Sequence, residues 1–309
     1  MPVRRALQRV FSPAIIAISF ISFTHSAQAQ PCQMALNETA LKVSQERAAA
    51  GDASAECGLG RQYEFALGVP QDNQQAVLWL QKSAEQGDLD AQTELGVVFS
   101  KMQDYAQALV WYRKAAEQGH PRAEYNLGLA YQNGEAVPKD MEQSIAWYHK
   151  AADQGDVLAE MNLAVVYDQG LGIPRNYPQA AAWYRKAADH GLPQAQYNLG
   201  LLYRYGRGVP EDDTQAVAWM LKAAEQGETG AQYNVGAAYA NGVGISRDLN
   251  EGYFWIYLAN ARTTDGGLKE QAGNTLEKLA EAMKKSDVKS AEKRAQAWLK
   301  KHPPLKTDE

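Results

Sequence analysis

One motif in this 309-residue sequence has the residue types and the spacing of a catalytic site. Ser286 and Lys289 form an S-x-x-K sequence, in which serine can be the nucleophile that opens a β-lactam ring. The companion motifs of that chemistry, S-D-N and K-T-G, are absent. Ser286 also stands where a final helix is expected to begin, and serine is a favoured N-cap residue. We therefore interpret Ser286 as a helix cap and predict that the chain is not an enzyme.

Other reactive residue types do not form a recognisable site. The sequence has no H-E-x-x-H, no G-x-S-x-G, no P-loop and no cysteine or histidine cluster with metal-ligand spacing. His25 lies in a segment that we expect to be removed. The other histidines each stand alone: His120, His149, His190 and His302. We predict neither a metal site nor a cofactor.

The sequence instead repeats itself. The stretch A-Q-Y-N-L-G at 195–200 has related copies at 55–60, 91–96, 123–128, 159–164 and 231–236. A tryptophan follows each copy: Trp79, Trp111, Trp147, Trp183, Trp219 and Trp255. Both series advance by 36 residues apart from one step of 32, which places a four-residue deletion between 97 and 110. A fixed period of this length is typical of a stacked repeat protein.

One unit predicts a helix, a turn and a second helix. Ala195, Leu199 and Leu202 lie on one face of the first helix, and the sequence G-R-G-V-P then ends that helix. The second helix, which contains Trp219, ends at Gly227. Two short helices cannot bury their apolar faces alone, so neighbouring units must stack. We expect the glycine that ends each copy to let helices approach closely and the tryptophans to pack between layers.

The full unit reads A-x-Y-N-L-G-x-x-Y-x-x-G-x-G-V-P, then D, then A-x-x-W-x-x-K-A-A-E-Q-G. It resembles the Sel1-like repeat, a longer-looped relative of the tetratricopeptide repeat. The resemblance covers residues 52–262 as six units, 52–87, 88–119, 120–155, 156–191, 192–227 and 228–262. It implies an all-α, right-handed α/α superhelical solenoid that scaffolds protein complexes, and it implies no particular ligand.

Four positions depart from this pattern. Ala66 and Ala136 replace loop glycines in the first and third units, and Ser246 replaces the loop proline of the sixth. Ala164 stands at the position of close helix approach in the fourth unit. The second unit lacks the long loop and resembles a tetratricopeptide unit.

Residues 1–29 have the features of a cleaved export signal. Its start is basic (Arg4, Arg5 and Arg9), and the apolar run at 10–23 is too short to span a bilayer. Ala27 and Ala29 form a small-x-small cleavage site, so we expect the mature chain to begin at Gln30. An uncleaved anchor is the alternative. We predict a periplasmic or secreted protein without membrane insertion after cleavage.

The two cysteines, Cys32 and Cys57, would then meet an oxidising compartment, and we predict a disulfide between them. Two free thiols are the alternative. Proline before Cys32 does not resemble a lipoprotein signal, so we expect no lipid anchor. We expect an N-terminal capping helix within 30–51, C-terminal capping helices within 263–304 and a tail at 305–309.

Charge is distributed unevenly along the chain. Removal of the three signal arginines changes the net charge from −5 to −8. Residues 268–309 contain ten Lys/Arg and seven Asp/Glu, or +3, so the preceding repeat array carries −11. An acidic array is a poor surface for nucleic acid.

The inner wall of the solenoid is the candidate binding surface. One equivalent position of the first helices carries an asparagine ladder: Asn126, Asn162, Asn198 and Asn234. Side-chain amides offer a donor and an acceptor, so the ladder could hold an extended peptide backbone. A local structural hydrogen bond is the alternative. Positions that vary between copies would set specificity: Arg61, Glu64, Phe65, Gln132, Asp168, Arg204 and Tyr205.

These observations predict an exported, monomeric scaffold that binds a protein or peptide partner on its concave face. Assembly or regulation of a cell-envelope complex is the expected role, as the family resemblance suggests. One alternative is a hydrolase, of β-lactams or another substrate, like the cysteine-rich Sel1-type proteins. Another is a secreted factor that binds a host protein.

Overall fold

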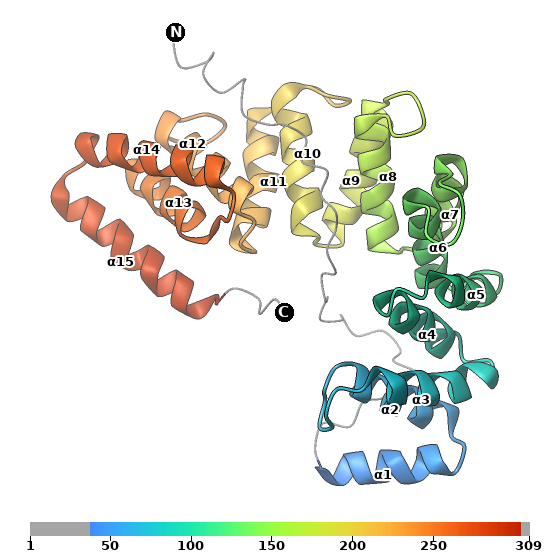
Figure 1. Cartoon of the computed structure of the whole chain (residues 1–309). Helices are drawn as coiled ribbons and strands as arrows, with labels where there is room; N and C mark the ends of the chain where they lie inside the picture. The colour runs from blue at the N-terminus through green and yellow to red at the C-terminus, as the bar shows by residue number, and fades with distance from the viewer. Residues whose placement is uncertain (1–37, 304–309) are drawn as a thin grey trace.

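The computed structural model describes residues 38–303, and this part of the chain folds into fifteen α-helices with no strand (Figure 1). An N-terminal helix, α1 (Glu38–Ala49), precedes six helix pairs. The first helices of the pairs are α2 (Ala53–Glu64), α4 (Leu89–Lys101), α6 (Pro121–Asn133), α8 (Val157–Gln169), α10 (Pro193–Tyr205) and α12 (Thr229–Asn241). The second helices are α3 (Asn73–Glu85), α5 (Tyr105–Ala116), α7 (Met141–Asp153), α9 (Tyr177–Asp189), α11 (Asp213–Glu225) and α13 (Leu249–Arg262). Two further helices, α14 (Gly266–Ala282) and α15 (Lys285–Lys301), follow.

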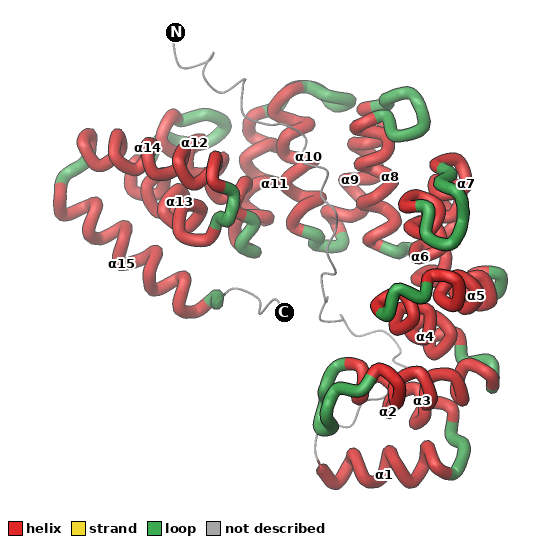
Figure 2. Tube along the Cα trace, viewed as in Figure 1, coloured by secondary structure: helices red, strands yellow, loops and turns green. Residues whose placement is uncertain are grey.

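The helix pairs stack side by side along an arc that leaves one side open (Figure 1). Each pair packs on the next, and short loops join the helices at the edges of the stack (Figure 2). The predicted all-α solenoid is confirmed. The export signal at 1–29, Gln30, Cys32 and the tail residues 305–309 lie outside the described residues, as does Pro304. No helix in 38–303 is both long and apolar enough to span a bilayer.

Caps at both helix ends explain why the repeat pattern folds into pairs. The aspartate that recurs in the pattern is the N-cap of the second helix. In the fifth repeat, for example, Asp212 accepts from the backbone N–H of Gln215 at 3.0 Å. This hydrogen bond satisfies a donor that the helix itself leaves unpaired. Four of the first helices end on a glycine in the left-handed conformation, with φ between 60° and 80°: Gly134, Gly170, Gly206 and Gly242.

Two loop positions keep the left-handed geometry without glycine. Ala66 has φ of 55° and Ala136 has φ of 56°, at the positions where other repeats have glycine. A side chain in this region costs roughly 1–2 kcal/mol, so both alanines are strained. The second repeat makes its shortened turn differently, because α4 ends at Lys101, α5 begins at Tyr105 and Gln103 has φ of 63°. The predicted deletion is therefore confirmed and lies in this turn.

Close helix approach occurs at the predicted small residue. A Cβ atom placed on Gly200 would lie 2.9 Å from the carbonyl oxygen of Ala216 and 2.7 Å from Cγ of Met220. The corresponding atom on Gly96 would lie 2.5 Å from the ring of Tyr112. First and second helices can therefore pack only if this position is small.

The predicted packing role of the tryptophans is confirmed in the later repeats, where Trp183, Trp219 and Trp255 are buried. A lysine three residues further on covers each of the first five tryptophan rings. The nitrogen-to-ring distances are 4.0 Å for Lys82, 4.8 Å for Lys114, 3.7 Å for Lys150, 3.8 Å for Lys186 and 3.7 Å for Lys222. These cation–π contacts shield the rings where the second helices face solvent.

The helices α14 and α15 cover the apolar side of α13. Leu276, Leu279 and Ala291 are buried against Tyr253 and Ile256. The interpretation of Ser286 as the cap of α15 is wrong, because Lys284 occupies the N-cap position and makes no side-chain cap bond. The chain already has helical geometry at Lys285, and Ser286 Oγ donates to Asp287 Oδ1 at 3.1 Å instead.

Candidate binding surface on the inner wall

The first helix of each pair forms the inner wall and is the more enclosed of the two. In α4 every residue from Ala91 to Val98 is buried, and α4 lies on the inner side of the arc with α5 outside it (Figure 1). The predicted asparagine ladder lies on these first helices. Asn162 is only 7% exposed and Asn234 only 8%, so neither presents an open amide to the concave side.

Tyrosine hydroxyls from neighbouring helices contact most of these asparagine side chains. The amide of Asn162 interacts with the hydroxyls of Tyr125 and Tyr148 and opposes the rise that burial causes in the pKa of each. Asn234 Nδ2 donates to the Tyr197 hydroxyl at 3.2 Å. The tyrosines belong to the preceding repeat, so each asparagine joins two layers. At Asn162 and Asn234 this geometry favours the structural alternative over direct contact with a peptide.

Asn198 and Asn126 are half-buried and differ from the other two. Asn198 bonds with the hydroxyl of Tyr184 and accepts from Gln194 at 3.4 Å. Asn126 Nδ2 is shielded from solvent and has no hydrogen-bond partner within the described residues. The preceding repeat has Thr93 where tyrosine would reach Asn126, and the Thr93 hydroxyl donates to Leu89 O at 2.8 Å. Asn126 is therefore the member of the ladder with an unused donor.

The predicted specificity positions divide into two groups. Three belong to the same polar network, because Gln132 accepts from the Tyr148 hydroxyl at 2.9 Å, Asp168 bonds with Tyr184, and Arg204 donates to Asn234 Oδ1 at 3.2 Å. Phe65 and Tyr205, at the ends of their helices, are 38% and 42% exposed. The two aromatic residues are therefore open to a partner.

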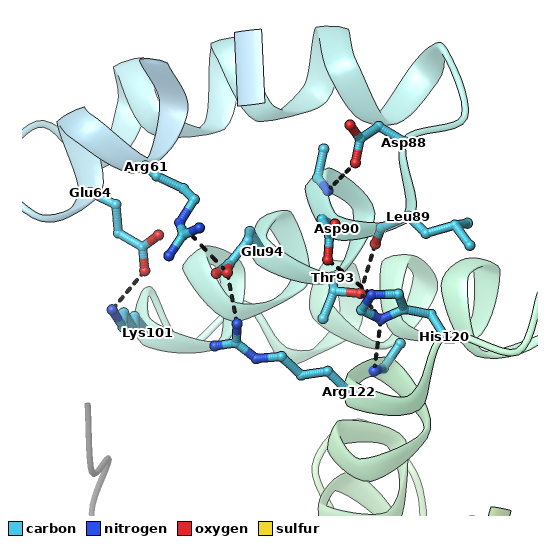
Figure 3. Close-up of polar contacts among 12 residues, drawn as sticks. Arg61, Glu64, Asp88, Leu89, Asp90, Thr93, Glu94, Lys101, His120 and Arg122 are labelled. Carbon is cyan, nitrogen blue, oxygen red and sulfur yellow. Dashed lines mark hydrogen bonds and ion pairs between the residues drawn. The ribbon is translucent and has the colours of Figure 1, made fainter. Parts of the chain in front are cut away.

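Arg61 and Glu64 belong to a charged cluster that replaces the neutral network in the first three repeats (Figure 3). Its members are Arg61 and Glu64 on α2, Glu94 and Lys101 on α4, and Arg122 on α6. Lys101 Nζ lies 2.7 Å from Glu64 Oε1, and Arg122 Nη1 lies 2.8 Å from Glu94 Oε1. Arg61 Nε approaches the same Glu94 oxygen at 3.8 Å. The cluster therefore spans three consecutive layers.

The charged cluster holds carboxylates that water barely reaches. The side chains of Glu64 and Glu94 are 1% and 5% exposed. Burial raises the pKa of Glu64, the negative charge of Glu94 raises it further, and Lys101 opposes the rise. Neither Glu64 Oε2, Glu94 Oε2 nor Arg61 Nε has a hydrogen-bond partner among residues 38–303. Buried polar atoms without partners are unusual, so the cluster is a polar interior whose hydrogen bonds are only partly satisfied by residues 38–303.

Three members of the charged cluster were not predicted from the sequence: Glu94, Lys101 and Arg122. The sequence did contain a sign of Glu94, because this residue replaces the asparagine of the pattern in the second copy, A-Q-T-E-L-G. Lys101 and Arg122 had none, because the pairing of side chains on different repeats depends on how the layers stack.

A set of bonds between the two helices of one pair was not predicted either. In the first, third, fourth and fifth copies, the E or Q after the first alanine contacts a residue 30 positions later, near the end of the second helix. Gln86 donates to Glu56 and Gln154 to Glu124, both at 2.7 Å, and His190 Nδ1 lies 3.0 Å from Glu160. The recurring E/Q and E-Q-G letters at a fixed distance could have revealed these bonds.

Two histidines, His120 and His149, make contacts between neighbouring repeats. His120 lies 2.9 Å from the Thr93 hydroxyl and 3.0 Å from Asp90 Oδ1. His149 lies 3.2 Å from the Tyr167 hydroxyl, and burial lowers its pKa. Within 38–303 no group of three or more His, Cys, Asp or Glu is placed to hold a metal ion. Cys57 is fully buried. Its bond to Cys32 stays a prediction.

Stacked pairs of helices with capped ends and a polar inner wall define an α-solenoid of the tetratricopeptide-like class. The chain belongs to the Sel1 repeat family, whose model matches residues 53–88, 89–120, 121–156, 157–192, 193–228 and 229–262. The chain has no match among curated proteins.

Two solved structures are similar over most of the chain. A protective antigen of uropathogenic Escherichia coli strains that displays an SLR fold is 36% identical, with a TM-score of 0.75 over 86% of this chain. The chain spans only 57% of that antigen. A Sel1 repeat protein from Oxalobacter formigenes is 34% identical, with a TM-score of 0.69, over 78% of this chain and 70% of the relative.

Proposed function

We propose that the chain is an exported scaffold that holds a protein or peptide partner on its inner wall and serves assembly or regulation of a cell-envelope complex. The charged cluster is the observation that carries the proposal. It pairs two buried carboxylates, Glu64 and Glu94, with Lys101 and Arg122, whose side chains are 33% and 45% exposed.

An extended peptide has the complementary groups. Its backbone carbonyl oxygens and carboxylates can accept from Lys101 and Arg122, the accessible members of the cluster. The exposed ring of Phe65, 4.8 Å from Lys101 Nζ, lies beside these groups and offers apolar contact. Aromatic and arginine side chains are also the types enriched in the energetic centres of protein interfaces.

Two observations support export. Residues 1–29 have the composition of a cleaved signal. The similar structure from uropathogenic Escherichia coli strains is described as a protective antigen. The partner is a protein of the cell envelope or a protein of a host. Identification of the bound partner distinguishes these two cases.

Site-directed photocrosslinking tests the proposal. A benzoylphenylalanine residue replaces Phe65 or Tyr205 on the inner side, and Leu78 or Val110 on the second helices as matched controls. Leu78 and Val110 are 46% and 57% exposed, so they are at least as accessible as the inner positions. We expect a discrete crosslinked partner in periplasm or culture medium from Phe65 or Tyr205 only. Equal crosslinking from all four positions, or none from the inner pair, would contradict the proposal.

A further inference from the structure

Arginine and tyrosine side chains gather on the loop edge of the fourth and fifth repeats. This arginine–tyrosine patch consists of Arg175 and Tyr177 between α8 and the start of α9, Arg204 and Tyr205 at the end of α10, and Arg207 in the following loop. The guanidinium carbon of Arg207 lies 5.6 Å from the ring centre of Tyr177 and 5.2 Å from that of Tyr205. Arg207 therefore bridges two repeats through two aromatic rings.

The loop backbone fixes this arrangement. A Cβ atom placed on Gly208 would lie 2.3 Å from the carbonyl carbon of Tyr177, so the loop of the fifth repeat rests directly on the start of α9. Arg175 Nη1 also donates to the Tyr177 hydroxyl at 3.2 Å. Because glycine alone fits this contact, Arg207 is held beside Tyr177 rather than free to move away.

The hydrogen-bonding capacity of Arg207 is unused. Arg207 makes no side-chain hydrogen bond among the described residues. No carboxylate oxygen of 38–303 lies within 4.0 Å of Arg175, Arg204 or Arg207. Asp168 is the nearby acid: burial raises its pKa, and the positive charges of Arg207 and Arg175 oppose the rise. Two cations, Arg207 and Arg175, thus act on one partly buried carboxyl.

The patch is a local cluster of arginines in an acidic array, and Glu211, Asp212 and Asp213 follow it in the same loop. The repeat region carries a net charge of −11. The position of Arg207 is occupied by apolar or acidic residues elsewhere: Leu67, Glu135, Leu171 and Val243. Only the fifth of these loops therefore carries a cation at this position.

We propose that the arginine–tyrosine patch binds an acidic segment of a protein partner, with carboxylates accepting from Arg207 and Arg175 and the Tyr205 ring in apolar contact. A guanidinium group recognises carboxylates with paired N–H donors, and its stacking on rings leaves that edge free. Arg207 is already oriented, so little side-chain freedom is lost on binding. The proposal deepens the proposed function by naming the chemistry of the partner.

Fluorescence anisotropy with a labelled octaglutamate peptide tests the patch, with labelled octalysine as the reverse-charge probe. We expect Arg207→Ala to weaken octaglutamate binding about tenfold and Arg207→Lys to weaken it less, because lysine keeps the charge without the paired donors. The matched control is Lys139→Ala, since exposed Lys139 occupies the position of Arg175 in the third repeat. That variant should change affinity by less than about twofold. Unchanged melting temperatures would show that each variant is folded.

Three outcomes would overturn the assignment. They are absence of octaglutamate binding at low salt, equal loss in Arg207→Ala and Lys139→Ala, or displacement of the peptide by inorganic phosphate but not by free glutamate. The purified protein is used throughout, so peptide binding is measured independently of any crosslinked partner. A partner captured at Phe65 by a protein that ignores octaglutamate would leave the proposed function standing and remove the patch.

Discussion

Arg122 on α6 donates to Glu94 on α4 across 2.8 Å, so the third repeat is tied to the second through a carboxylate that is 5% exposed. Glu94 in turn raises the pKa of Arg122, although burial opposes that rise. The contact stabilises the stack and leaves only the arginine side chain accessible, at 45% exposed.

The first prediction concerns this pair. Arg122→Met should lower the free energy of unfolding by roughly 1–3 kcal/mol, because Glu94 would lose its close partner while remaining buried. Lys293→Met, at an exposed position on α15, should change stability by about 0.5 kcal/mol or less. Chemical denaturation followed by circular dichroism measures both. Equal effects of the two substitutions would remove the structural role of the pair.

The second prediction separates the asparagines. Asn162→Ala should lower stability by roughly 1–3 kcal/mol, because the hydroxyls of Tyr125 and Tyr148 would both lose a partner. Asn126→Ala removes a donor that is already unpaired and should change stability by about 0.5 kcal/mol or less. Thermal unfolding and partner binding are measured on the same proteins. A stable Asn162→Ala variant that has lost its partner would restore the ladder as a binding surface.

The third prediction concerns the strained alanines. Ala66→Gly and Ala136→Gly should each raise stability by up to about 1 kcal/mol, because relief of the left-handed strain exceeds the extra freedom of glycine in the unfolded chain. Gly208→Ala is the reverse control and should destabilise, since its Cβ would collide with Tyr177. Denaturant midpoints decide. Loss of stability in both alanine variants would show that their methyl groups pack usefully.

The fourth prediction concerns pH. Burial raises the pKa of Glu228, the N-cap of α12, from 4.5 to about 7. The folded chain therefore binds more protons than the unfolded chain within this window, and the stabilising contribution present at low pH is lost as the pH rises through it. Glu228→Gln should flatten the fall in stability between pH 4.5 and 7 by an amount on the order of 3 kcal/mol. Parallel pH profiles for the two proteins would refute the assignment.

The fifth prediction concerns processing. Protein isolated from the periplasm or medium should begin at Gln30, because Ala27 and Ala29 form the cleavage site. Its intact mass should rise by two hydrogens on reduction if Cys32 and Cys57 are bonded. Retained Met1, a lipid-sized increment on Cys32, or two labelled thiols per denatured chain would contradict these expectations.

The fold was predictable because its determinants are local and repeated. The glycine after each first helix, the aspartate before each second helix and the fixed tryptophan spacing all act within one unit. The candidate site was less predictable because its contacts join units. Asn162 looked like an open amide in sequence, and only the stacking of repeats brings Tyr125 and Tyr148 to it. The prediction that Ser286 caps α15 failed for a different reason. A favoured cap residue does not set the start of a helix when the residue before it, here Lys285, is already helical.

The short turn between Lys101 and Tyr105 gives the solenoid an uneven stiffness. In later repeats the loop rests on the preceding second helix, with Gly172 against Met141, Gly208 against Tyr177 and Gly244 against Asp213. The second repeat has no such strut, so its joint with the first repeat is held by helix packing and by the ion pairs of the charged cluster. Salt screens these pairs little, because their carboxylates are buried. The N-terminal end of the arc should therefore bend more easily than the later repeats, where loop and helix contacts both hold the layers.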